Sequence, residues 1–476
     1  MKGSLNKGFL TYLFLFIGLV LAVFLILACI LLFSPGTEIL GFMFVSENHT
    51  YEIKTINGDD GTVLLDGQGN QVETSNEPTT INFQTLSKLK ITSNCFDIKV
   101  FTADLSYIEI QNNIRAFTRT KGINQTTITK QYNLLTNTLE IVINDSDYTL
   151  DIKDNRIVYL FLSEQDYKNL AVEFVTNDGD IEFGGSNGIN FEEHKLQSLT
   201  ASVNSGNITL SKYITVPTLS FVNLSTKKGN INITEDLGNL LLSSLELHVN
   251  DGKLKSGNIN SANIKLSGNM VDGSLGNITG NLNVNIENGL LNLGNVTGNI
   301  NDTEETVKNL KLNVGAVTGN VNFPNATSAD LSFDIICGDA IITTQSGNIT
   351  VKDLRGRGDI DSESGDISVL IGQTNNQNVD ITSQKGDITI YCQSVKATNN
   401  VTTKANIKAV YTEGLVFKLV AKADKIELKN ENVVKQDEQV IGYPGVNDPQ
   451  IETSDILNLT TEKTITVERM ASVVWA

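Results

Sequence analysis

This 476-residue chain is poor in the residue types that most catalytic and metal sites need. It contains one tryptophan and three histidines, and aromatic residues make up only 7%. The histidines, His49, His194 and His248, lie far apart without ligand spacing, so neither zinc nor a Ser-His-Asp triad is supported. A polysaccharide-acting β-helix enzyme needs paired carboxylates and aromatic platforms, and neither stands out. We therefore expect no enzyme activity, catalytic residue, cofactor or metal.

Basic residues are also scarce. Lys and Arg number 36 against 54 Asp and Glu, which gives a net charge of −18. Without Lys2 and Lys7, which precede a long apolar run, the balance is 34 against 54, or −20. Such a surface repels phosphate backbones and anionic lipids, so we expect no nucleic acid partner and no adhesion to anionic lipid.

Cysteines are too few for a disulfide framework. One of the four, Cys29, lies in the apolar run, and the odd remainder is Cys95, Cys337 and Cys392. By period-2 alternation, Cys337 follows Phe333 and Ile335, and Cys392 falls in a similar strand, so both are expected to face the core. Buried free thiols are the default expectation, and a Cys337–Cys392 bridge is the alternative.

What the chain has in abundance is a short phrase of Gly, then Asp or Asn, then an aliphatic residue. It occurs at positions 179–181, 206–208, 229–231, 257–259, 319–321, 347–349, 358–360, 365–367 and 386–388. Gly and Asx accept the backbone of a tight turn, and the aliphatic residue begins a short alternating strand. Recurrence about every 20 residues is typical of stacked, quasi-one-dimensional proteins.

The repeat predicts an all-β fold, a single-stranded β-solenoid (β-helix) with rungs of roughly 20 residues. One such strand cannot bury its apolar face alone, whereas stacked rungs close a continuous core. On each rung the turn falls at the same corner, so Asp and Asn side chains are expected to form ladders there. A β-propeller or a Greek-key sandwich, which also needs many short strands and turns, is the alternative. Propeller blades, however, repeat about every 40 residues and carry aromatic signatures that this chain lacks.

An apolar run from Phe9 to Phe33 predicts one transmembrane helix. It is longer than the apolar part of a cleaved signal peptide, so we expect an uncleaved anchor. Lys2 and Lys7 before it keep the N-terminus inside by the positive-inside rule, and the C-terminal part is then extracellular. The segment 26–29 loosely resembles a lipoprotein cleavage site, but the chain stays apolar after Cys29, which favours the helix.

The composition along the chain predicts five parts. These are a cytoplasmic tail (1–8), a transmembrane signal-anchor (9–33), a stalk with the first strands (34–78), the solenoid (79–426) and an atypical C-terminal cap (427–476). The cap is expected to hide the open sheet edge. The apolar tail Val473-Val474-Trp475-Ala476 is expected to tuck into this cap, with partner binding as the alternative.

The order of strands resembles a known family. The matching runs are 89–100, 137–141, 157–162, 170–174 and 177–181, and the likeness extends over roughly residues 85–395. This order is similar to the putative-adhesin family of bacterial and some eukaryotic surface proteins, which are β-solenoids of unknown function. The resemblance implies a membrane-linked surface solenoid, and it carries over no catalytic residue.

Three short sequence motifs suggest binding or modification, and each also has a simpler explanation. Arg357-Gly358-Asp359 spells an integrin-binding tripeptide but coincides with the repeat phrase, so coincidence is favoured. Asp339, Asp359, Asp366 and Asp387 invite calcium, yet the calcium-binding nonapeptide is absent and solvated turn caps explain them. Thirteen Asn-x-Ser/Thr sequons occur, of which Asn207 and Asn348 lie in the turn, and these predict a glycoprotein if the host is eukaryotic.

Together these features predict a single-pass cell-membrane protein with an extracellular, rigid ectodomain for adhesion or cell-envelope interaction. The expected partner is a surface protein or a glycan. Two other functions remain open from the residues alone: an envelope scaffold or sensor that binds a protein partner, and a polysaccharide-acting enzyme.

Overall fold

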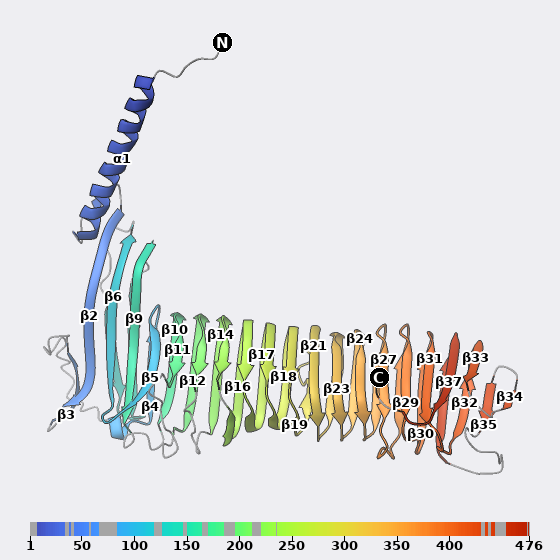
Figure 1. The fold of residues 1–476 in the computed structure, drawn as a ribbon. Coiled ribbons are helices and arrows are strands. Elements are labelled where there is room, and N and C mark those ends of the chain that lie inside the picture. The colour runs from blue at the N-terminus through green and yellow to red at the C-terminus, as the bar shows by residue number, and fades with distance from the viewer. Residues whose placement is uncertain are drawn as a thin grey trace.

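The structure is a computed structural model of the whole chain. It describes residues 7–33, 38–39, 42–56, 59–65, 83–118, 126–145, 150–163, 170–184, 196–211, 220–234, 236–429, 434–436, 439–442, 454–473 and 475. One helix, α1 (Lys7–Phe33), precedes an elongated all-β body. All strands belong to one continuous sheet that coils along the long axis of the body (Figure 1). This is the solenoid-like all-β architecture that the repeat predicts.

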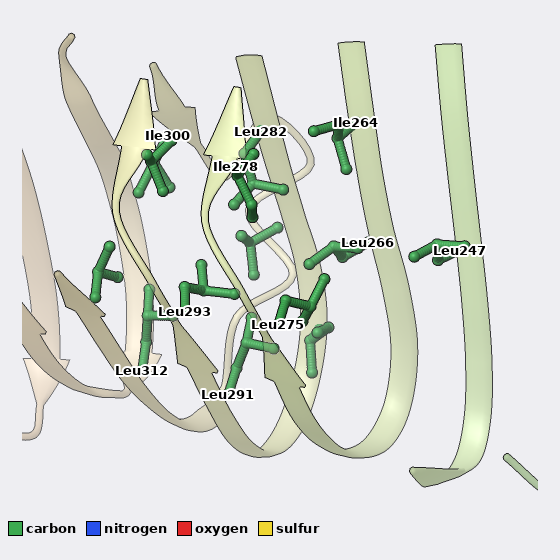
Figure 2. Packing of buried hydrophobic residues seen from close by; sticks show 14 of the residues in the cluster. Leu247, Ile264, Leu266, Leu275, Ile278, Leu282, Leu291, Leu293, Ile300 and Leu312 are labelled. Atoms are coloured by element: carbon green, nitrogen blue, oxygen red, sulfur yellow. The ribbon is translucent and has the colours of Figure 1, made fainter. Parts of the chain in front are cut away.

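Successive rungs stack through parallel pairing. In the N-terminal half the strands are β10 (Ala171–Asp178), β11 (Ile181–Phe183), β12 (Ser198–Ser205), β13 (Ile208–Leu210), β14 (Phe221–Lys228), β15 (Ile231–Ile233), β16 (Leu237–Ser256), β17 (Ile259–Leu275), β18 (Ile278–Leu293), β19 (Val296–Thr297) and β20 (Ile300–Asn301). Inward residues align in register, as Leu247 does with Leu266 and Ile264 with Leu282 (Figure 2). Because most rungs place an aliphatic residue at these positions, the buried side chains form one large cluster along the body.

The C-terminal half repeats this arrangement with shorter strands. They are β21 (Asn309–Val317), β22 (Val321–Ser328), β23 (Asp330–Ile336), β24 (Ala340–Ser346), β25 (Ile349–Leu354), β26 (Gly358–Ser362), β27 (Ile367–Ile371), β28 (Val379–Ser383), β29 (Ile388–Cys392), β30 (Thr398–Thr403) and β31 (Ile407–Thr412). Their burial patterns alternate between inward and outward residues, as in β29, where Ile388, Ile390 and Cys392 are buried. This alternation is the period that the sequence shows.

The Gly-Asx phrase forms ladders at the corners. The side-chain oxygen of Asp180 accepts a hydrogen bond from the backbone N–H of Asn207 (2.7 Å), 27 positions later in the chain. Asn207 in turn accepts from the N–H of Asn230 (3.0 Å). The glycine is needed because a Cβ on Gly229 would lie 1.9 Å from the carbonyl oxygen of Gly206 on the neighbouring rung. Each corner N–H group thus finds an acceptor on the preceding rung.

At the N-terminal end the rungs do not follow chain order. The strands β4 (Lys88–Ser93) and β5 (Asp97–Ala103) lie between the pair β8 (Thr138–Asn144) and β9 (Leu150–Ser163) on one side and β10 and β11 on the other. The stack is closed by antiparallel neighbours, β6 (Tyr107–Thr118) on β9 and β7 (Thr127–Asn133) on β8. A short 3-10 turn, Phe83–Thr85, precedes β4.

A buried ion pair joins these out-of-order rungs. The guanidinium of Arg156 on β9 lies 3.6 Å from the carboxylate of Asp145, and their side chains are 7% and 0% exposed. Arg156 also pairs with Asp154 and donates to the Cys95 sulfur (3.0 Å) in the β4–β5 corner. Asn94 in that corner exchanges hydrogen bonds with the backbone of Asp145. The cluster therefore ties the inserted rung to its neighbour.

Three long strands leave the flank of the body. Residues 43–49 of β2 (Phe42–Ile56), 112–118 of β6 and 150–156 of β9 pair with one another, whereas β5 pairs only from residue 157 of β9 onward. This three-stranded extension, here called the stem, points toward α1 (Figure 1). Two further strands complete this end, β1 (Glu38–Ile39) and β3 (Asp59–Leu65), both antiparallel to β2.

The C-terminal end also departs from chain order. From the predicted cap, 427–476, β36 (Ile456–Thr461) and β37 (Thr464–Met470) form a rung on β30 and β31. The strands β32 (Lys418–Lys422) and β33 (Lys425–Lys429), which come earlier in the chain, lie beyond that rung. The outermost strands, β35 (Gln439–Gly442) and β34 (Val434–Gln436), pair in antiparallel fashion. Antiparallel strands therefore cover the parallel stack at both ends, which limits edge-to-edge association.

Candidate ligand-binding surface

One column of outward-facing positions runs along the body, and we call it the outer strip. Its members each follow a core residue on successive rungs: Gly294, Gly315, Asp334, Lys352, Leu370, Tyr391 and Val410. The first four positions are small or charged, and the last three are apolar. The strip therefore has a polar half and an apolar half.

The polar half is an open trough of about 500 Å³. Asn292, Asn313 and Ser332 form one wall, and Gly294 and Gly315 also line the trough. The Asn313 amide donates to the Asn292 oxygen (2.7 Å), so the wall is rigid and polar. At the far end, the Lys352 ammonium lies 2.7 Å from the Asp334 carboxylate.

The apolar half is covered by the end of the chain. Leu370 and Val410 are buried against Val473, and Trp475 packs on Tyr391 with ring centroids 5.5 Å apart. The described residues of the tail, Val473 and Trp475, therefore lie over β27, β29 and β31. The tail was expected to tuck into a terminal cap. It folds back instead over the outer face of regular rungs, because these three rungs place apolar residues at outward positions.

The sequence carried a signal for this strip that the repeat analysis missed. Most rungs alternate strictly, but Val369-Leu370-Ile371 and Ile390-Tyr391-Cys392 are unbroken apolar runs. In a half-buried strand, the middle residue of such a run must face outward. An outward apolar residue on each of three neighbouring rungs indicates a covered face.

The Arg357-Gly358-Asp359 tripeptide is part of the repeat architecture. Gly358 begins β26 and is buried, and a Cβ there would lie 2.8 Å from Leu354. Arg357 and Asp359 flank it on the outer face, 58% and 55% exposed, and their charged groups lie 4.0 Å apart. The two charges thus face each other in a strand.

The aspartates considered as calcium ligands form hydrogen bonds or an ion pair within the protein. Asp339, Asp366 and Asp387 accept hydrogen bonds from backbone N–H groups of the next rung, at 3.1, 2.8 and 2.9 Å. The fourth, Asp359, faces Arg357. Within the part of the chain that the structure describes, no three His, Cys, Asp or Glu side chains gather as metal ligands would. Turn capping accounts for Asp339, Asp366 and Asp387, and an ion pair accounts for Asp359.

The cysteine prediction is half wrong. Cys392 is buried, as alternation predicts, but Cys337 is exposed, and the structure joins neither of them in a disulfide. The reason is a corner within β23: Phe333 and Ile336 are buried while both residues between them face outward, so the alternation shifts by one position. Cys95 is half-buried beside Arg156.

The two histidines that the structure describes, His49 and His248, lie on different strands, β2 and β16. His248 is half-buried, with Nδ1 3.0 Å from the Ser267 hydroxyl, and burial followed by the nearby Lys265 lowers its pKa. His49 is exposed on β2 near the Tyr51 ring. His194 lies outside the described residues.

The two turn sequons do lie on exposed corners. Asn207 and Asn348 both use their side-chain oxygens as ladder acceptors, for Asn230 and Asp366. The Asn207 amide nitrogen additionally donates to Asp180 (3.1 Å). A glycan on either residue would therefore project from the corner of a rung.

The apolar helix meets the requirement for a membrane span. Thr11–Ile30 has a mean hydropathy of 3.3, and none of it is buried in the body. A membrane anchor and a signal sequence share this property, so the helix by itself does not distinguish them.

No protein-family model and no curated protein sequence matches this chain. Its structural neighbours include a putative cell adhesion protein from Clostridium sporogenes, 8% identical, with 81% of this chain and 94% of that chain covered and a TM-score of 0.15. Another is a putative lipid binding protein from Parabacteroides distasonis, 10% identical, with the same coverages and TM-score. Values this low do not decide between functions, and the resemblance to the putative-adhesin family stays a prediction.

Proposed function

We propose that this chain is a single-pass membrane protein whose solenoid-like body binds a partner on the outside of the cell, as in adhesion or cell-envelope interaction. The observation that carries the proposal is the direct connection between helix and body. Only four positions separate Phe33 from β1, which begins at Glu38. Chain geometry limits that connection to about 18 Å, so the stem, where β1 pairs with β2, begins close to the bilayer.

The stem sets how the body is presented. Residues 150–156 of β9 extend past β5, which corresponds to about 23 Å at 3.3 Å per residue. Because the strands run across the long axis of the body, the stem emerges from its flank (Figure 1). We propose that the body lies alongside the membrane, with its faces available to a surface protein or glycan, and that the protein binds and does not catalyse.

Cys337 offers a test of topology without an added tag. It is exposed on the body, whereas Cys392 is buried and Cys29 lies in the helix. A membrane-impermeant maleimide should label intact cells that express the wild type and should give much less signal with Cys337→Ser. Labelling that appears only after lysis would place the body inside the cell and favour the scaffold role.

The non-catalytic part of the proposal has its own test. The purified full-length protein is incubated with a panel of neutral and acidic polysaccharides, and new reducing ends are measured. A flat time course is expected. Turnover would refute this part of the proposal without affecting the topology.

A further inference from the structure

The apolar half of the outer strip is built to hold a peptide. Leu370, Tyr391 and Val410 occupy one register position on β27, β29 and β31. They point away from the core, so they contribute nothing to the packing inside the rungs. Buried outward residues of this kind need a partner, and here the partner is the chain's own C-terminal segment, Val473 to Trp475.

The segment is held by a few specific contacts. The backbone N–H of Val473 donates to the Thr412 hydroxyl (3.3 Å), and the Gln393 amide donates to the Val473 carbonyl (2.7 Å). Trp475 then lies over Tyr391. The segment begins after Met470, where β37 ends, and its described residues, 471–473 and 475, belong to no strand. It is therefore attached as a ligand is, through side chains of the strip.

The segment covers only part of the strip. Val473 is buried with Leu370 on β27 and Val410 on β31, and Trp475 lies on Tyr391 of β29 between them. The next position of the strip beyond Leu370 is Lys352 on β25, where the trough begins. The trough is open to solvent, with Asn292 and Asn313 along its wall and the Asp334–Lys352 pair at the end nearest β27. A longer extended peptide would fill both halves.

We infer that the outer strip is a binding site for an extended peptide of a partner protein, with an aliphatic and an aromatic side chain over Leu370, Tyr391 and Val410 and polar residues in the trough. The chain's own C-terminus occupies the apolar half and competes with that partner. Tethering gives the C-terminus an effective concentration in the millimolar range, so the site opens only to a tighter or longer peptide. This goes beyond the proposed surface function and does not depend on membrane topology.

Trp475 makes the inference directly measurable, because it is the only tryptophan in the chain. A variant that ends at Met470 has no tryptophan, so the fluorescence of a synthetic peptide ASVVWA, the last six residues, reports binding alone. Full-length protein in detergent serves for comparison. We expect a saturable blue shift with the truncated variant and at least about tenfold weaker binding to the full-length protein, whose site is occupied.

Two variants and a scrambled peptide decide the specificity. Tyr391→Asp in the truncated protein should abolish the shift, whereas Thr350→Asp, an outward change two rungs away on the same face, should leave it unchanged. A scrambled peptide should not bind. Absence of saturable binding to a truncated protein with the wild-type circular dichroism spectrum would overturn the inference, as would binding that Tyr391→Asp does not weaken.

A third variant covers the case in which truncation disturbs folding. Full-length Trp475→Ala keeps the backbone contacts of Val473 but loses the ring, so it also contains no tryptophan. The peptide should bind it more weakly than the truncated protein and more strongly than the wild type. Equal binding to Trp475→Ala and to the wild type would count against the strip as the site.

Discussion

The side-chain oxygen of Asn348 accepts a hydrogen bond from the backbone N–H of Asp366 at 3.0 Å, and the backbone N–H of Asn348 donates to Asp330 at 2.8 Å. Each such residue is thus both donor and acceptor in a line that continues through Asp387 to Asn406. The partners lie 18 to 21 positions apart in the chain, so the ladder fixes the register of one rung on the next. An Asp or an Asn side chain can take a position in this ladder, because both provide an oxygen that accepts the hydrogen bond.

Replacement of a ladder residue tests this role. Asn348→Ala removes the acceptor for the Asp366 N–H and should lower the free energy of unfolding by about 1 kcal/mol. Asn348→Asp keeps an oxygen in the same place and should stay within about 0.5 kcal/mol of the wild type. Urea unfolding followed by circular dichroism measures both. Equal losses in the two variants would show that the acceptor is not the cause.

The glycines at the Gly-Asx corners should tolerate a side chain far less well than glycines in open turns. A Cβ on Gly365 would lie 1.8 Å from the Gly347 carbonyl oxygen, whereas Gly414 has nothing within 4 Å but a φ of +90°. Gly365→Ala should cost at least about 3 kcal/mol because the rungs must separate. Gly414→Ala should cost about 1–2 kcal/mol, from backbone conformation alone. Thermal melts of the two variants would rank them, and a reversed order would refute the close-approach argument.

The buried ion pair at the N-terminal end should matter more than ion pairs on the surface. Arg156→Met leaves Asp145, whose side chain is 0% exposed, without its cation and should cost about 3–5 kcal/mol. Lys308→Met breaks a pair with Glu287 whose side chains are 53% and 39% exposed, and should cost at most about 1 kcal/mol.

Hydrogen exchange would locate the Arg156 effect. Faster exchange is expected in β4, β5, β8 and β9, because the cluster joins their corners, while the rungs of β21 to β29 should exchange as in the wild type. Uniform acceleration along the whole chain would mean that the cluster does not act locally.

The sequence indicated the rungs well because the Gly-Asx phrase encodes a local turn and the alternation a local strand. It did not indicate the order of the rungs. The local sequences of β4 and β36 do not indicate that each of these strands lies between strands distant in the chain, since pairing depends on tertiary packing. The outer strip was missed for a related reason: Leu370, Tyr391 and Val410 become neighbours only after stacking.

The alternation predicted that Cys337 and Cys392 are both buried, and thiol chemistry should distinguish them. Burial raises the pKa of Cys392 to about 12, so at pH 8 only about one in 10,000 of its thiols is ionised in the folded state. Since the thiolate is the reactive form, iodoacetamide at pH 8 should modify exposed Cys337 and spare Cys392 until urea unfolds the protein.

Ionisation of the Cys392 thiol favours the unfolded state, so the free energy of unfolding should fall as pH rises above about 9, and Cys392→Val should remove that part of the fall. Mass spectrometry of the alkylated peptides gives the outcome, and early modification of Cys392 in the folded protein would contradict the rung register at β29.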